Sequence, residues 1–382
     1  MLKLPENFKT FNEARQSGFM KMKKLKEDGG RVIGIYCSFV PLEIIMAAKA
    51  APVSLCATSE EPINAAEADL PRNLCPLIKA SYGFALTDTC PYFYFSDLIV
   101  GETTCDGKRK MFEIMNELKE TYVMKLPNHR DDMALTVWEH EMVKFKEKLE
   151  DFYGITITED DIKECIRLKN IERDVVLKFL ELGKLDPSPV TGYELGTKLD
   201  ALSFIPDIHE RISQIEKRTE EVLKDWEENY KGRTSKRPRI LITGCPNGGV
   251  RDKTIKALEE LGADVVAFDA CNAIREKIEK VDPQLPIYKA LAKKYLNINC
   301  SIMSPNTARL EYIGDMIDEY HIDGVLEIIL QACHTFAIES HYVKKTVLEK
   351  GKSYIMIETD YSKSDVGQIN TRLEAFLETI DK

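Results

Sequence analysis

Short apolar runs alternate with longer amphipathic stretches over the first third of the chain. The run RVIGIYC ends at Cys37, and Pro41 suits the first turn of the helix that follows. The alternation of strand-like and helix-like stretches continues through PVSLC, DLIVGETTC, DGKRKMFEIMNELKE and TYVMKLP. Because strand–helix–strand repeats build parallel sheets, this pattern predicts an open, Rossmann-like α/β domain with leading polar helices over residues 1–137.

Charged residues and helical periodicity dominate the middle of the chain, residues 138–237. Thr158 with Asp161 provides a capping start for one long helix, and Pro206 opens a second. The basic stretch KGRTSKRPR, Lys231 to Arg239, is interpreted as a solvated linker, with an anion or partner contact as the alternative. We therefore expect a helical connecting segment here.

The strand–helix alternation restarts at Arg239 and continues to the end of the chain, which predicts a second open α/β domain over residues 238–382. The two halves align coarsely, because VIGIYC resembles ILITGC, PVSLC resembles DVVAFDAC, and DLIVGETTC resembles DGVLEIILQAC. This order predicts an internal repeat of one domain; coincidence between two generic α/β domains is the alternative.

Composition and hydropathy argue against a nucleic-acid-binding, secreted or membrane-spanning protein. The formal net charge of -10 argues against nucleic acid as a partner. The N-terminus lacks the apolar core of a signal peptide, and no apolar run reaches the length of a membrane span. We therefore expect a cytoplasmic protein without a membrane partner, in which thiols stay reduced.

Ten cysteines are the chemically most informative residues. None forms a C-x-x-C pair, so the short spacing of structural zinc sites is missing. Several stand where a predicted strand ends, and open parallel sheets bind ligands beyond those ends. Dispersed thiolates converging there favour a soft iron–sulfur centre, although buried structural thiols remain an alternative for each one. The cysteines near predicted strand ends are Cys37, Cys105, Cys245, Cys271 and Cys333.

Two further features carry weaker chemistry. His334, beside Cys333, is a candidate to donate a proton or hydrogen bond near a reduced centre, although a plain surface or core histidine is the simpler interpretation. TGCPNGG, from Thr243 to Gly249, lacks both the lysine of a P-loop and the G-x-G-x-x-G spacing. We therefore expect a tight turn carrying Cys245, and no nucleotide bound by this chain.

Several segments together resemble the 2-hydroxyacyl-CoA dehydratase superfamily, which includes the benzoyl-CoA reductase-type subunits. Among its branches, the cysteines in both halves and QACHTFAIES are most similar to the double-cubane cluster proteins. The resemblance covers roughly residues 30–125 and 238–380. The matching segments are IYCSFVPLEIIMAAKAAPVSLC, NLCPLIKASYG, TTCDGKRKM, ITGCPNGG, DGVLEIILQACHTFAIES and IETDYSKSDVGQINTRLEAF.

The resemblance implies a homodimer in which each chain holds two 4Fe-4S cubanes joined by a sulfide. It assigns Cys37, Cys75 and Cys105 to one cubane. It assigns Cys300 and Cys333 to the other, with Cys245 or Cys271 as the third ligand. No ligand position matches Cys56 or Cys90, and both are interpreted as structural, as is Cys165.

The resemblance also implies an activity. A separate ATP-hydrolysing iron–sulfur activator would deliver low-potential electrons, and this chain would pass them to a small-molecule substrate. One alternative is a 2-hydroxyacyl-CoA dehydratase subunit that uses a ketyl-radical mechanism. Another is a zinc-bound or metal-free scaffold without redox activity.

Overall fold

The computed structural model describes residues 2–269 and 274–380 and contains two compact units. Unit 1 comprises residues 1–170, 203–207 and 279–298, and unit 2 comprises residues 171–202, 208–278 and 299–382. Residues 138–237 are shared between the two units, since residues up to 170 and residues 203–207 belong to unit 1 and the others to unit 2.

Four parallel strands form the sheet of unit 1 in the order β2-β1-β3-β4. Gly34 of β1 pairs with Val53 of β2 and with Ile99 of β3. Every strand overlaps a run that the sequence predicts as a strand, although β2 begins two residues before PVSLC. The strands are β1 (Arg31–Ile35), β2 (Ala50–Ser54), β3 (Leu98–Glu102) and β4 (Thr121–Met124).

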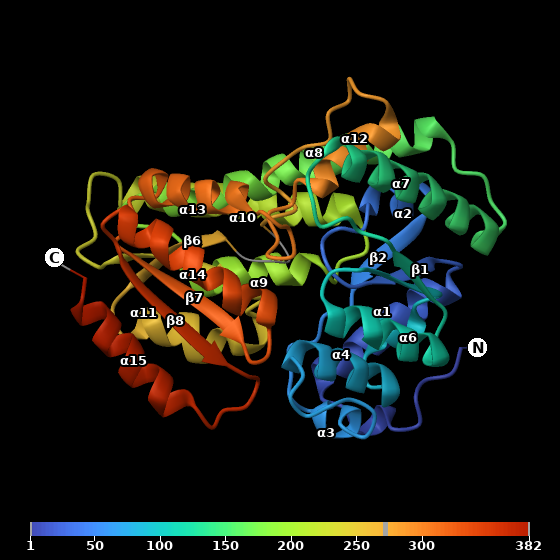
Figure 1. The fold of residues 1–382 in the computed structure, drawn as a ribbon, viewed down its shortest axis with the longest axis horizontal. Coiled ribbons are helices and arrows are strands. Elements are labelled where there is room, and N and C mark those ends of the chain that lie inside the picture. The colour runs from blue at the N-terminus through green and yellow to red at the C-terminus, as the bar shows by residue number, and fades with distance from the viewer. Residues whose placement is uncertain (1, 270–273, 381–382) are drawn as a thin grey trace. The chain divides into compact units, whose positions relative to one another are not determined.

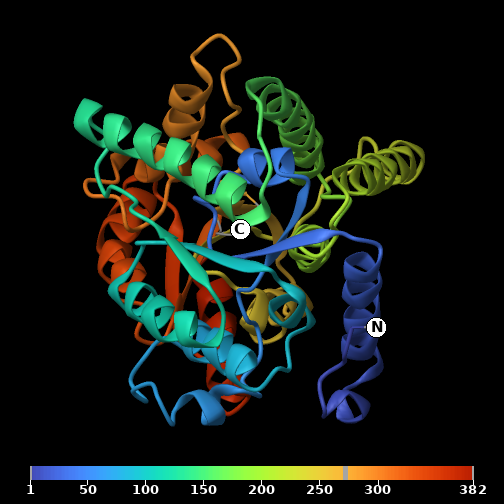
Figure 2. The same cartoon turned by 90° about the vertical axis from the view of Figure 1, so that its right-hand side faces the viewer.

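Helices cover this sheet through aromatic contacts. α1 (Glu13–Glu27), dark blue in Figure 2, inserts Phe19 into a buried cluster with Val32 of β1 and Phe95 of α5 (Pro91–Phe95). α6 (Asp106–Leu118) crosses β3 so closely that a Cβ on Gly101 would lie 2.2 Å from the Phe112 ring. The other helices of unit 1 are α2 (Leu42–Ala47), α3 (Ile63–Ala66), α4 (Pro76–Leu86), α7 (Asp132–Tyr153) and α12 (Ile287–Leu296), with the 3₁₀ turn η1 (Phe8–Thr10).

The sheet of unit 2 repeats the topology of unit 1, with four parallel strands in the order β6-β5-β7-β8. Each strand takes the place of the strand four positions earlier in the chain, so β5 corresponds to β1 and β7 to β3. The predicted pairing of the two halves is therefore confirmed at the level of topology. The strands are β5 (Arg239–Gly244), β6 (Asp264–Asp269), β7 (Gly324–Leu330) and β8 (Ser353–Thr359).

Helices cover both faces of this second sheet (Figure 1). Val325 of β7 packs in one cluster with α13 (Thr307–Glu319) and α14 (His334–Glu349), while its neighbour Gly324 meets Phe376 of α15 (Val366–Glu378). Successive strand residues point to opposite faces, so α15 lies opposite α13 and α14. The other helical elements are η2 (Leu182–Lys184), α9 (Gly192–Leu202), α10 (Ile208–Asn229), η3 (Gly248–Val250), η4 (Asp252–Lys256) and α11 (Ala257–Glu260).

The longest helices are amphipathic. α8 (Glu159–Glu181) begins as predicted, because the Asp161 amide donates to the Thr158 hydroxyl and the Thr158 amide donates to the Asp161 carboxylate, each at 3.1 Å.

Within residues 2–269 and 274–380, the structure contains no helix that is both long and apolar enough to span a membrane.

The basic stretch before β5 is only partly a solvated linker. Arg237 donates to the Ala263 carbonyl at 2.6 Å, and Arg239 donates to the carbonyls of Gly183 and Tyr320 at 2.6 and 2.9 Å. These carbonyls lie where helices and turns end, and such groups need donors from elsewhere in the chain. The end of the stretch therefore anchors β5, which corrects the expectation of a simple linker.

Candidate functional site

Three cysteines of unit 1 lie just beyond the carboxyl ends of adjacent strands. Cys37 follows the end of β1 by two residues, Cys56 follows β2 by two, and Cys105 follows β3 by three. Cys37 adopts a positive φ of 84°, a conformation that side chains other than glycine rarely take. Such backbone strain is concentrated at functional sites in proteins. The strand-end placement predicted for Cys37 and Cys105 is confirmed.

The buried ammonium of Lys108, in the first turn of α6, lies close to all three thiols. Burial disfavours its charge, but Cys37, Cys56, the buried carboxyl group of Glu102 and Cys105 together raise the pKa of Lys108 well above its ordinary value. The Nζ atom also lies 5.8 Å from the centre of the Tyr36 ring. This edge of the sheet therefore gathers thiols around one fixed positive charge, which suits an anionic group.

Cys75 joins this edge through helix packing. It directly precedes α4, as Cys105 directly precedes α6, and the two helices pack together. A Cβ on Gly107 would lie 2.8 Å from Ile78 and 3.0 Å from Leu74, which are neighbours of Cys75 in the chain. The first turns of α4 and α6 therefore approach each other and bring Cys75 toward Cys105.

In unit 2, Cys245 and Cys333 are connected through the end of β7. The Leu330 amide donates to the Cys245 sulfur at 3.4 Å, and the Cys333 amide donates to the Leu330 carbonyl at 3.0 Å. Cys245 directly follows β5 and is 0% exposed, whereas Cys333 directly precedes α14. Their predicted positions at strand ends are confirmed.

Cys300 is held beside the start of α14. Ser301 donates a hydrogen bond from its hydroxyl to that of Thr335 at 3.1 Å, which ties the segment after Cys300 to the residues after Cys333. Asn306 in turn donates from its side chain to the Cys300 carbonyl at 3.0 Å. Three candidate ligands of the second half, Cys245, Cys300 and Cys333, thus lie along one edge of unit 2.

Cys271 lies outside the residues that the structure describes, so the choice between Cys245 and Cys271 stays a prediction. Cys56, which the sequence marks as structural, also lies at the cysteine-bearing edge of unit 1, and its structural role stays a prediction. It lies beside Lys108 with two candidate ligands. The sequence carried a signal for this, because PVSLC aligns with DVVAFDAC in the internal repeat and Cys56 therefore matches Cys271.

Cys90 and Cys165 have local structural surroundings. The Cys90 sulfur accepts a hydrogen bond from the Phe93 amide at 3.5 Å and caps α5, and burial raises the pKa of its thiol. Burial, with a smaller effect of Glu43, raises the pKa of Cys165 to about 12. Both thiols therefore stay protonated at neutral pH, unlike metal-bound thiolates.

The structure also shows where His334 and the TGCPNGG loop lie. His334 is the exposed first residue of α14, and its proposed role near a reduced centre stays a prediction. Among residues 2–269 and 274–380, no three His, Cys, Asp or Glu side chains converge closely enough to hold a single metal ion. In TGCPNGG, Gly244 ends β5 with a φ of +107°, the chain bends at Cys245, and the 3₁₀ turn η3 begins at Gly248.

Comparison with known proteins identifies the family. A model of the family "2-hydroxyglutaryl-CoA dehydratase, D-component" matches residues 37–380, nearly the whole chain. The chain belongs to this dehydratase family. The match covers both α/β units and all the candidate cysteines, so the resemblance found in the sequence is confirmed.

Three relatives illustrate the range of this dehydratase family. The chain is 48% identical over 379 residues to "Putative dehydratase subunit YjiM" of Escherichia coli, covering 99% of this chain and 98% of that protein. It is 23% identical over 364 residues to the (R)-phenyllactyl-CoA dehydratase beta subunit of Clostridium sporogenes, covering 94% of each. It is 23% identical over 317 residues to a subunit of the benzoyl-CoA reductase of Thauera aromatica, covering 75% of this chain and 70% of that protein.

A frame of buried charges lies at the ends of β5 and β6 in this dehydratase-family chain. The Asp269 carboxylate accepts hydrogen bonds from Arg275 and Arg309, each at 2.9 Å, and from the Thr243 hydroxyl at 2.7 Å. Although burial opposes ionisation, the two arginines hold the pKa of Asp269 well below its usual value. The carboxylate therefore stays charged and fixes the strand ends beside Cys245.

Glu327, in the centre of β7, is a second buried carboxyl group in this region. Burial raises its pKa to about 7, even though Arg309 lies nearby and the Tyr354 hydroxyl donates to it at 2.6 Å. Glu327 therefore changes charge near neutral pH, whereas Asp269 does not.

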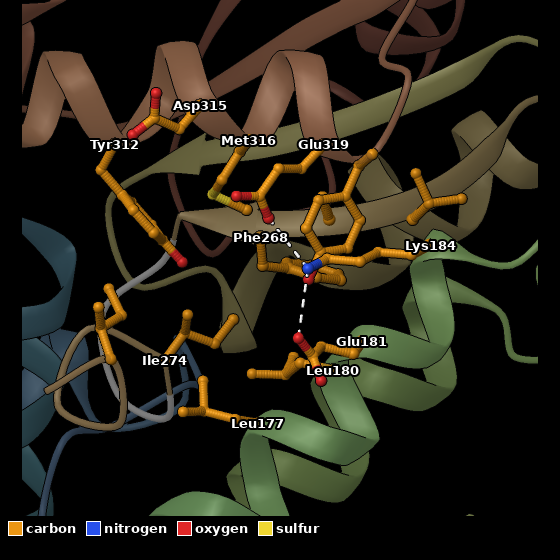
Figure 3. Close-up of a pocket in the computed structure, with 14 residues that line it drawn as sticks. Leu177, Leu180, Glu181, Lys184, Phe268, Ile274, Tyr312, Asp315, Met316 and Glu319 are labelled. Atoms are coloured by element: carbon orange, nitrogen blue, oxygen red, sulfur yellow. Dashed lines mark hydrogen bonds and ion pairs between the residues drawn. The ribbon is translucent and has the colours of Figure 1, made fainter. Parts of the chain in front are cut away.

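Unit 2 also contains a cavity of about 190 Å³ between β6, α8 and α13 (Figure 3). Its walls are mainly apolar, with Leu177, Phe268 and Met316 among them. Lys184 lies at its margin, 2.9 Å from the Glu319 carboxylate and 3.2 Å from that of Glu181. No cysteine is among the described residues that line it, so the cavity is distinct from the cysteine-bearing edge.

Proposed function

We propose that this chain is an iron–sulfur reductase that holds a double-cubane cluster and transfers low-potential electrons to a small molecule. The observation that carries the proposal is the repetition of candidate thiols at the carboxyl edge of both sheets. Cysteines follow β1 and β3 in unit 1, and cysteines follow β5 and β7 in unit 2. A protein with one cluster needs only one such set.

The chemistry of the donors fits iron–sulfur clusters. Each thiolate of a 4Fe-4S cubane binds its own iron, so the ligands surround the cluster and need not converge on a single point. Cys37, Cys75 and Cys105 would hold one cubane. Cys300 and Cys333 would hold the other, with Cys245 or Cys271 as the third ligand, and a sulfide would bridge the two cubanes.

When bound, the clusters would store and transfer electrons at low potential, and the surrounding residues would set that potential. Cluster potentials depend on net charge, hydrogen bonds and solvent exposure. The buried ammonium of Lys108 lies beside the thiols of unit 1 and would stabilise added negative charge there. The paired charges around Asp269 would keep the edge of unit 2 rigid and exclude water from it.

The proposed electron source is a separate ATP-hydrolysing iron–sulfur activator, and the proposed assembly is a cytoplasmic homodimer. The relatives are named as subunits, and the family model is named as a component, which supports dependence on a partner protein. The loop Thr243–Gly249 has no P-loop lysine, which agrees with ATP hydrolysis on the partner.

Iron analysis tests the proposal. Protein purified without oxygen is expected to be brown and to contain about eight irons per chain, as two 4Fe-4S units require. A clearly lower iron content in active protein would contradict the double cluster. Stoichiometric zinc in place of iron, or colourless protein after anaerobic reconstitution, would instead favour the scaffold alternative.

A second candidate is a 2-hydroxyacyl-CoA dehydratase subunit, which the family match and the (R)-phenyllactyl-CoA dehydratase relative favour. Incubation with activator, ATP and a 2-hydroxyacyl-CoA distinguishes the two functions. The reductase proposal predicts no steady elimination of water. Sustained formation of the unsaturated acyl-CoA would establish the dehydratase function instead.

A further inference from the structure

Two buried polar groups next to candidate ligands have no hydrogen-bond partner within the described chain. One is the side-chain Nδ2 of Asn247 in unit 2, and the other is the hydroxyl of Thr104 in unit 1. Asn247 is only 5% exposed. An unsatisfied buried polar group costs about 1–3 kcal/mol, so proteins rarely retain one without a reason.

The orientation of the Asn247 amide is fixed by its neighbours. Its Oδ1 accepts a hydrogen bond from Arg251 at 3.2 Å, and the same nitrogen of Arg251 donates to Asp200 at 2.7 Å. The carbonyl oxygen is therefore committed to the guanidinium group. The Nδ2 atom, on the other branch of the planar amide, must point away from Arg251 and is a donor rather than an acceptor.

Both groups lie at the sheet edges that carry the cysteines. Asn247 is two residues after Cys245 in the loop beyond β5. Thr104 directly precedes Cys105 beyond β3. Each unit thus places one buried, unsatisfied donor beside a candidate ligand, where an open parallel sheet binds its ligand.

Arg251 also has a buried donor without a hydrogen-bond partner, but this donor cannot reach a bound ligand. Its Nε atom is also buried without a partner, but an added Cβ on Gly196 would lie only 2.7 Å from it. Helix α9 therefore covers that nitrogen. Asn247 Nδ2 is the group of this loop that fits a hydrogen bond to a bound ligand.

We propose that Asn247 and Thr104 donate hydrogen bonds to sulfur atoms of the bound clusters, one in each unit, and thereby raise the cluster potentials. This inference rests on the proposed function. A hydrogen bond withdraws negative charge from sulfur and stabilises the reduced form more than the oxidised form. Both residues are positioning residues that tune the clusters, not catalytic residues.

The test is a redox titration of the anaerobic holoprotein, followed by electron paramagnetic resonance. Asn247→Asp keeps the acceptor for Arg251 but removes the donor, Asn247→Leu removes it without adding charge, and Thr104→Val removes the hydroxyl. Each is expected to lower the ratio of reduced to oxidised cluster about tenfold at a fixed applied potential, or about 59 mV for one electron. Iron content should stay at the wild-type value.

Asn229→Asp serves as the matched control, because Asn229 is an exposed residue at the end of α10 that bonds only to Asp225 among the described contacts. It is expected to leave the potential unchanged. Unchanged potentials in all three test variants, at full iron content, would overturn the inference. A wild-type protein without clusters would instead refute the proposed function, so the two failures are distinguishable.

Discussion

The cysteine-bearing edges of the two units share one strand order but differ in their electrostatics. In unit 1 the thiols of Cys37 and Cys105 and the buried carboxyl group of Glu102 lie near the buried ammonium of Lys108. In unit 2 the edge beside Cys245 contains arginines that are paired with Asp269. Topology therefore places the thiols, whereas the surrounding charges give each edge its own character. Two clusters bound at these edges are expected to differ in potential.

The largest expected effect is the loss of the cluster at one edge while the cluster at the other edge is retained. Cys105→Ser is expected to remove the cubane of unit 1 and to lower the iron content from about eight to about four per chain. Cys90→Ser is the matched control, because Cys90 caps α5 and is not a proposed ligand. This variant is expected to keep about eight irons per chain. Iron and sulfide analysis of anaerobic protein measures both. Full iron in Cys105→Ser would show that Cys105 is no ligand.

Disrupting the charge frame of unit 2 is expected to destabilise the fold. Arg309→Met removes a partner of the buried Asp269 and is expected to lower the free energy of unfolding by about 3–5 kcal/mol. Arg167→Met breaks an exposed pair with Glu164 and is expected to cost less than about 1 kcal/mol. Denaturant unfolding compares the two variants. Equal, small effects would show that the frame is not structurally important.

Glu327 predicts a pH dependence specific to unit 2. Its folded pKa of about 7 lies above the ordinary value of 4.5, so its stabilising contribution is present below about pH 4.5 and is lost as the pH rises through 7. The full loss is about 3 kcal/mol. Glu327→Gln does not titrate, so its unfolding free energy should gain about this amount relative to wild type between pH 4.5 and pH 8. Parallel pH profiles would contradict the assignment.

The charge of Lys108 predicts the smallest effect in this series, on the potential of the unit 1 cluster. Lys108→Met is expected to shift the ratio of reduced to oxidised cluster about tenfold toward the oxidised form, or about 1.4 kcal/mol. Lys110→Met, on the same helix in an exposed pair with Glu113, is the control. Identical potentials for the two variants in a redox titration would show that the charge of Lys108 does not set the potential of the unit 1 cluster.

Much of the fold and part of the site follow from the sequence. Each strand overlaps a predicted apolar run, because a buried parallel strand needs a short continuous stretch of apolar residues, although β2 begins two residues before the run PVSLC. The cysteines then follow at the strand ends by chain continuity. The partner choices of the helices could not be predicted, since α12 packs on α7 through contacts between residues far apart in sequence.

Side-chain environments were the least predictable part. The position of Cys56 beside Lys108 depends on how α6 packs on the sheet, which no local pattern specifies. Nor does any local pattern indicate that the Asn247 Nδ2 atom and the Thr104 hydroxyl are buried without a hydrogen-bond partner in the described chain. Such features depend on tertiary packing, and they separate a site residue from an ordinary buried one.

The most direct test of the two-cluster account is an anaerobic crystal structure with anomalous diffraction data collected at the iron edge. The account predicts iron at both cysteine-bearing edges, with Cys37, Cys75 and Cys105 bound to one group of irons and Cys300 and Cys333 bound to the other. Iron at a single edge, or a protein with full activity and no iron, would contradict it.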